Sequence, residues 1–333
     1  MIQNVTSLEM PVDEEFKIVK NHICHGKGKR ICIVTGTHGD ELEGQYVCYL
    51  IAKMLNENIH KLSGTVDIYP ALNPLGIDTM QRGVPAFDLD MNRIFPGKSN
   101  GSMIEKVAHD IYTDLLGADM VIDIHASNIF LREIPQVRIS EMTAEKLVPY
   151  AKLMGIDFIW IHQAATVLES TLAHSLNSSG TPCLVAEMAV GGRISHSMCH
   201  SLADGIQNLM FNMGIWSEAP DTEKIKEGIV CEGPDTVEFL NAQTSGIFVT
   251  EIHNGVNVST GQMIGQIISP LTGRVLSNVT SPCNGLLFTI RAYPVVYEGS
   301  LLGRIYKSDK QETKGNKQDE DTNNIQYGLA IQR

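Results

Sequence analysis

The sequence predicts an α/β domain, built on a mixed, largely parallel sheet flanked by helices, followed by a small all-β, barrel-like domain. Two observations predict this order. Over the first two-thirds of the 333 residues, short apolar runs alternate with longer segments whose apolar residues recur at helical spacing. From about residue 236, glycines recur between short apolar runs, which is typical of a small barrel or sandwich.

The predicted α/β part begins with a β-branched run at 30–35 that ends at Gly36, the pattern of a buried strand. Apolar content and spacing define the elements that follow. We expect further strands at 65–69, 119–124, 158–161 and 183–187, and helices at 42–55, 103–116, 143–154 and 194–213. Because ligands bind beyond the carboxyl ends of parallel strands, polar residues at those ends are candidates for a functional site.

Changes in composition divide the chain into four predicted parts. The α/β domain spans 1–216, and an acidic, proline-containing linker spans 217–235. The β domain spans 236–307. A polar tail at 308–333 has few apolar residues, and we expect it to be disordered.

The overall charge and the lack of targeting segments narrow the function. A formal net charge of −12 argues against nucleic-acid and anionic-membrane partners. No apolar stretch is long enough for a transmembrane helix, and the N-terminus does not resemble a secretory signal. The seven cysteines are dispersed, which indicates reduced thiols. These features predict a cytoplasmic protein, and a homo-oligomer is compatible with them.

Two short segments predict a metal site. His38 and Glu41 lie three residues apart between a predicted strand and helix, and His125 ends another predicted strand. Imidazole nitrogen and carboxylate oxygen suit Zn²⁺, and three protein ligands leave a fourth position for water. Each segment alone also fits a simpler interpretation: a loop histidine beside a helix-capping acid, or a core pair of His125 with Asp123. Together they predict one catalytic zinc ion per chain.

Two other segments carry candidate functional side chains. Asn92 and Arg93 offer amide and guanidinium donors suited to a carboxylate, and Arg82 adds a second cation. A solvated surface segment explains the same residues. Glu187 ends an apolar strand, as a general base near bound water requires, although a helix-capping or surface-paired glutamate fits as well.

These motifs, in this order, resemble the succinylglutamate desuccinylase/aspartoacylase family, a branch of the zinc carboxypeptidase clan. The resemblance spans residues 30–190. Its motifs are Gly36-Thr37-His38-Gly39-Asp40-Glu41, Asn73-Pro74-Leu75-Gly76, Asp90-Met91-Asn92-Arg93-Ile94-Phe95-Pro96-Gly97, Asp123-Ile124-His125 and the strand-terminal Glu187.

The resemblance implies a carboxypeptidase-like fold and a role for each matched residue. Zinc would be bound by His38, Glu41 and His125. Glu187 would be the general base, Asn92 and Arg93 would bind the substrate carboxylate, and Arg82 would polarise the scissile carbonyl. A tyrosine and a late arginine that bind substrate in the family match no motif here, and the candidates are Tyr293, Tyr297 and Arg193.

The C-terminal region resembles the β domain appended to many family members, which is similar to a biotinyl or lipoyl barrel. A carrier function requires a modifiable lysine in the hairpin, and residues 276–287 contain none. We therefore expect this domain to be a lid, a pocket wall or an oligomer contact.

The resulting functional hypothesis is a zinc-dependent amidohydrolase that removes an acyl group, such as acetyl or succinyl, from a small N-acyl amino acid or diamino acid. The alternative enzyme is a metallocarboxypeptidase acting on short peptides. A metal-free binding protein on the same scaffold and a carrier module are two further alternatives.

Overall fold

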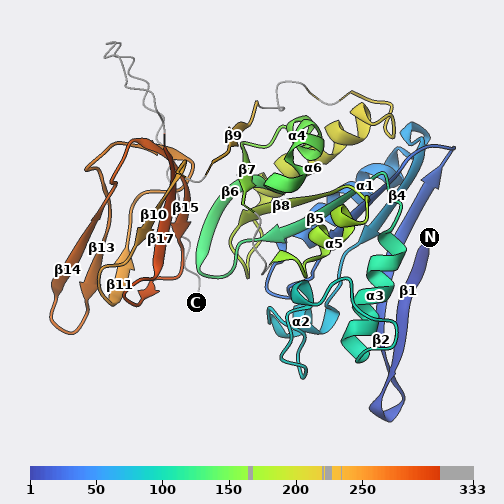
Figure 1. The fold of residues 1–333 in the computed structure, drawn as a ribbon, viewed down its shortest axis with the longest axis horizontal. Coiled ribbons are helices and arrows are strands. Elements are labelled where there is room, and N and C mark those ends of the chain that lie inside the picture. The colour runs from blue at the N-terminus through green and yellow to red at the C-terminus, as the bar shows by residue number, and fades with distance from the viewer. Residues whose placement is uncertain (164–167, 220, 222–226, 234, 308–333) are drawn as a thin grey trace, which may run out of the picture.

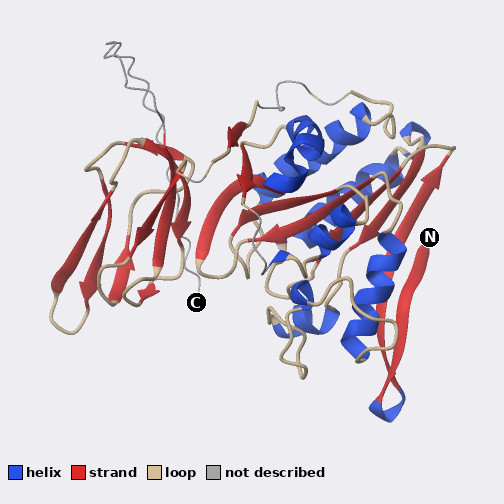
Figure 2. Cartoon of the chain, viewed as in Figure 1, coloured by secondary structure: helices blue, strands red, loops and turns tan. Residues whose placement is uncertain are grey.

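The computed structural model describes residues 1–163, 168–219, 221, 227–233 and 235–307. Its main feature is a sheet of 13 strands that runs through the molecule (Figures 1 and 2). The tail that we expect to be disordered lies outside the described residues, as do residues 220, 222–226 and 234 of the expected linker. In the part of the chain that is described, no helix is both long and apolar enough to cross a membrane.

The centre of the sheet is parallel, with the strand order β4-β3-β5-β8. These strands are β4 (Gly64–Tyr69), β3 (Arg30–Thr35), β5 (Met120–Ala126) and β8 (Cys183–Ala189). All correspond to strands predicted from apolar runs, and every residue of β5 is buried. Strands buried on both faces read as continuous apolar segments, which is why they were predictable.

Helices cover both faces of this centre, and each face has its own apolar core. One face packs against α1 (Glu43–Glu57), α4 (Ala144–Leu153) and α6 (His196–Asn212). The other packs against α3 (Met103–Leu115) and α5 (Leu172–Ser178). The short α2 (Pro74–Thr79) follows β4. Single turns of 3-10 helix occur at Pro11–Asp13, Ile59–Lys61, Met91–Arg93 and Glu141–Thr143.

Three long strands were not predicted from the sequence. β1 (Ile2–Met10) and β2 (Glu14–His25) form an antiparallel hairpin that extends the sheet beside β4. β6 (Leu131–Ser140) runs antiparallel to β8 and is followed in the sheet by β7 (Phe158–His162) and β9 (Ile229–Cys231). All three unpredicted strands mix charged and apolar residues, and β6 contains Pro135, so none has the pattern of a buried strand.

The C-terminal strands form two packed sheets around a third apolar core. β10 (Val237–Asn241), β12 (Val256–Val258), β15 (Gly285–Arg291) and β17 (Leu301–Lys307) join the large sheet, because β15 pairs with β6. β11 (Gly246–Val249), β13 (Met263–Ser269), β14 (Arg274–Thr280) and β16 (Val295–Val296) form the second sheet. The predicted fold class, a mixed α/β sheet with an all-β C-terminal region, is confirmed.

Candidate metal centre and active site

Two adjacent parallel strands bring the three predicted metal ligands together. His38 and Glu41 lie in the turn between β3 and α1, and His125 lies near the carboxyl end of β5, which pairs with β3. Gly39 fits this turn tightly against α2, since a Cβ atom there would be 1.9 Å from the carbonyl carbon of Gly76. The tight turn and the paired strands therefore fix where these side chains point.

The cluster of His38, Glu41 and His125 is compact and buried. Nδ1 of His38 lies 2.7 Å from Oε1 of Glu41, and Nδ1 of His125 lies 2.9 Å from Oε2 of the same carboxylate. The two Nδ1 atoms are 3.3 Å apart. Within the described part of the chain, this is the one group of three such side chains close enough to share a metal ion.

The opposite nitrogen of each histidine faces a second carboxylate. Nε2 of His38 is 3.1 Å from Oδ1 of Asp90, and Nε2 of His125 is 3.2 Å from Oδ2 of Asp123. Burial opposes ionisation of Asp90, but its contact with His38 outweighs this effect and lowers the pKa of that carboxyl. Carboxylates in these positions orient metal-binding histidines. They favour the ring proton on the nitrogen that faces the carboxylate, here Nε2, and leave Nδ1 free to bind the metal.

This arrangement fits a zinc ion. With the ring protons assigned to Nε2, both Nδ1 atoms present lone pairs to each other and to Glu41. Such a group is repulsive unless a cation stands between its members. Ligands at about 2.0–2.1 Å from a tetrahedral zinc ion lie about 3.3 Å from one another. The two Nδ1 atoms have this separation, and the distances of 2.7 and 2.9 Å to Glu41 are shorter.

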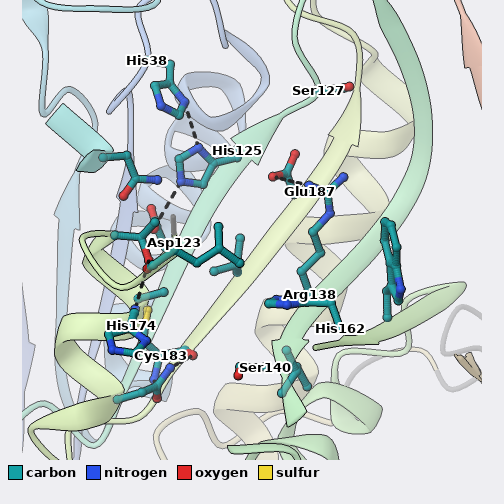
Figure 3. A pocket seen from close by; sticks show the side chains of 18 of the residues that line it. His38, Asp123, His125, Ser127, Arg138, Ser140, His162, His174, Cys183 and Glu187 are labelled. Carbon is teal, nitrogen blue, oxygen red and sulfur yellow. Dashed lines mark hydrogen bonds and ion pairs between the residues drawn. The ribbon is translucent and has the colours of Figure 1, made fainter. Parts of the chain in front are cut away.

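Glu187 lies beside this cluster on the neighbouring strand. It is the register partner of His125 in the parallel pair of β5 and β8, so the two side chains share one face of the sheet. Figure 3 shows His38 and His125 on one side of a cavity, with Glu187 facing them. Burial raises the pKa of Glu187, and Arg138 opposes this shift through an ion pair of 3.2 Å.

Arg82 also reaches the cluster. Its Nη1 lies 3.2 Å from Oε1 of Glu41, and its Nη2 lies 3.2 Å from Oδ2 of Asp90. The side chain of Arg82 is 41% exposed, so the guanidinium connects the buried Glu41 and the partly exposed Asp90 to the solvent.

Asn92 and Arg93 line the same cavity but differ in their hydrogen-bond partners. The side-chain oxygen of Asn92 accepts a hydrogen bond of 2.9 Å from the backbone N–H of Leu172, which leaves the amide nitrogen as the group to donate. Arg93 donates to the carbonyl oxygen of Asn92, and no carboxylate among the described residues lies within ion-pair distance of it.

The cavity has a volume of about 760 Å³ and extends well beyond the cluster. Its far wall holds Glu133, Arg138, Trp160 and Arg304, none of which was predicted as a site residue. The segments that contain these residues carry no motif. The residues meet because β6 pairs with the C-terminal strands, and this pairing cannot be recognised in any one segment. The earlier candidates Tyr293, Tyr297 and Arg193 are not among the described residues that line the cavity.

Comparisons with known proteins agree with this geometry. Residues 27–212 match the family model of the succinylglutamate desuccinylase/aspartoacylase catalytic domain. An N-alpha-acetyl-L-2,4-diaminobutyric acid deacetylase from Halomonas elongata is 25% identical over 251 residues, which cover 73% of this chain and 71% of that protein.

Solved structures share the fold over nearly the whole chain. The product-bound ectoine utilization protein EutE from Ruegeria pomeroyi has a TM-score of 0.79 at 20% identity, covering 92% of this chain and 95% of that one. A succinylglutamate desuccinylase/aspartoacylase from Rhodobacter sphaeroides has a TM-score of 0.77 at 21% identity, covering 91% and 95%.

Proposed function

Because the chain belongs to the succinylglutamate desuccinylase/aspartoacylase family, we propose that it is a zinc-dependent hydrolase that removes an acyl group from a small N-acyl amino acid or diamino acid. The observation that carries this proposal is the juxtaposition of His38, Glu41 and His125 with Glu187 at the wall of one cavity. A diaminobutyrate deacetylase among the relatives supports the substrate class.

The metal centre would be formed by His38, Glu41 and His125. When bound there, zinc supplies Lewis acidity, which lowers the pKa of water to about 7. The histidine side chains are held for this role by Asp90 and Asp123.

The side chains around the cluster have complementary roles in amide hydrolysis. Glu187 takes a proton from the attacking water and delivers it to the nitrogen of the leaving amine. Arg82 donates hydrogen bonds to the carbonyl oxygen as negative charge develops on it. The net reaction adds the water oxygen to the acyl carbon, breaks the C–N bond and protonates the amine.

The substrate carboxylate would be bound by Asn92 and Arg93. The amide nitrogen of Asn92 remains available after its oxygen has bonded to Leu172. The guanidinium of Arg93 faces the cavity without a carboxylate partner among the described residues, as an anion-binding group requires.

The test combines metal analysis with a substrate panel. Purified protein is assayed for bound metal, and for amine release from N-acetyl, N-succinyl and N-formyl amino acids and diamino acids. We expect one zinc ion per chain and turnover of one of these classes. Release of C-terminal residues from peptides, with no deacylation, would identify a metallocarboxypeptidase. Binding of an acyl amino acid without metal or turnover would identify a binding protein.

A further inference from the structure

A buried carboxylate joins the C-terminal strands to the wall of the active site. Glu133 is fully buried and accepts three hydrogen bonds. Its Oε2 lies 2.6 Å from Arg138, and its Oε1 lies 2.6 Å from Arg304 and 3.2 Å from the hydroxyl of Thr289. Glu133, Thr289 and Arg304 form one row across β6, β15 and β17, because Thr289 is the register partner of both others.

Arg138 divides its guanidinium between two carboxylates. Nη2 binds Glu133, while Nη1 lies 3.2 Å from Oε1 of Glu187. The guanidinium groups of Arg138 and Arg304 both lie 5.5 Å from the ring centre of Trp160, within the range of a cation–π contact. The contacts therefore form a continuous chain from Arg304 through Glu133 and Arg138 to Glu187.

The charges of these four side chains balance, and loss of either arginine alone leaves one carboxylate without a cation. Two carboxylates face two guanidinium groups, and Glu133 has no access to solvent that would stabilise an unpaired charge. Without Arg304, Glu133 would depend on Arg138 alone. A buried carboxylate left with one cation draws both arms of that cation to itself, since a bidentate pair is the stronger arrangement.

We propose that Arg304 is a positioning residue of the active site: it neutralises Glu133, so that one arm of Arg138 remains available to hold Glu187. The inference rests on the proposed function for the role of Glu187 as general base. It makes the C-terminal β-strands a working part of the active site, beyond a wall that limits the size of the substrate.

The kinetic test uses Arg304→Gln, with Arg274→Gln as the matched control from exposed strand β14. We expect Arg304→Gln to lower kcat roughly 10–100-fold, the usual effect of losing a side chain that holds an active-site residue in place, with zinc content retained and little change in KM. The control should match the wild type. An unchanged kcat in Arg304→Gln would overturn the proposal.

Two double variants separate positioning from loss of structure. Glu133→Gln with Arg304→Gln restores the charge balance, and we expect it to recover most of the lost kcat, because Arg138 then has only Glu187 to bind. Glu187→Gln with Arg304→Gln should be no slower than Glu187→Gln alone. Failure of the first pair to recover, or additive losses in the second, would contradict the proposal.

A crystal structure of Arg304→Gln decides the matter independently of activity. We expect both arms of Arg138 to bind Glu133 and the contact between Arg138 and Glu187 to be lost. An unchanged contact overturns the positioning role even if deacylation is confirmed. A lost contact in a protein that turns over no acyl substrate would instead leave the positioning intact and refute the proposed function.

Discussion

The histidine side chains near the metal centre have separate contacts on their two nitrogens. Nδ1 of His125 faces Glu41 and His38, whereas Nε2 faces Asp123. We expect His125→Ala to lose stoichiometric zinc, because two protein ligands are left of three. Elemental analysis of the purified variant measures this. Full zinc occupancy in the variant would remove His125 from the ligand set.

Glu187 should behave differently, because it lies beside the cluster and makes its ion pair with Arg138. We expect Glu187→Ala to keep its zinc and to lower turnover by about 10²–10⁴-fold, the usual contribution of a general base. Metal content and kcat are measured on the same preparation. Turnover near the wild-type rate would place the base elsewhere.

The cysteines provide a test of burial that is independent of function. Burial raises the pKa of Cys32, Cys48 and Cys199 to about 12, so at pH 8 their reactive thiolate fraction is about 10⁻⁴. Cys24 is exposed. We expect iodoacetamide to modify Cys24 first in the folded protein, and all seven cysteines in urea. Peptide mapping by mass spectrometry measures this, and early labelling of the buried thiols would contradict the packing.

Sequence motifs could predict the residues of the cluster but not those of the opposite wall. His38 and Glu41 are neighbours in one turn, and His125 lies near the end of a mainly apolar strand that is buried throughout, so each carries a local signal. Glu133 and Arg304 meet across 171 residues of sequence. Their contact depends on strand pairing, which single-residue patterns do not encode.

At the level of elements, α3 shows how a local signal fixes a boundary. Ser102 accepts a hydrogen bond from the backbone N–H of Glu105, whose side chain accepts one from the backbone N–H of Ser102. We expect Ser102→Ala to lower the free energy of unfolding by about 1 kcal/mol, the usual effect of losing an N-cap. Urea denaturation measures it. Zinc content and kcat should be unchanged, since α3 lies away from the cavity, and a stability equal to that of the wild type would show that the cap is dispensable.

Elements differ in predictability because they differ in burial. The central strands are covered on both faces and appear in the sequence as mainly apolar runs. β6 lacks the regular alternation of a half-buried strand, because Arg132 and Glu133 are consecutive and Pro135 interrupts the run, and its residues Arg138 and Ser140 line the cavity. The wall residues Glu133 and Arg138, which the sequence analysis missed, thus lie on a strand that it did not predict.

On the scale of the whole molecule, apolar contacts join the C-terminal strands to the α/β part, as the ion pairs of Glu133, Arg138 and Arg304 do. Phe158 of β7 stacks on Phe288 of β15, with ring centres 4.7 Å apart, in a small core that also includes Val237 of β10. The sequence predicted a separate β domain at 236–307, and those boundaries stay a prediction. The pairing of β15 with β6 shows that this region completes the large sheet. Glycine spacing predicted the strands but carried no information on where they dock.

Removal of residues 236–333 therefore tests whether the α/β part is independent. The shortened chain loses the stacking partner of Phe158, the strand beside β6 and the hydrogen bonds from Thr289 and Arg304 to Glu133. An exposed phenylalanine alone costs about 1.5–3 kcal/mol, and an unpaired buried carboxylate adds to this. We expect loss of cooperative thermal unfolding and of turnover, measured by circular dichroism and by amine release. Removal of residues 308–333 is the control, because none of the contacts described here is lost. A chain of residues 1–235 that melts cooperatively near the full-length temperature and keeps its kcat would show that the C-terminal strands are dispensable to both fold and site.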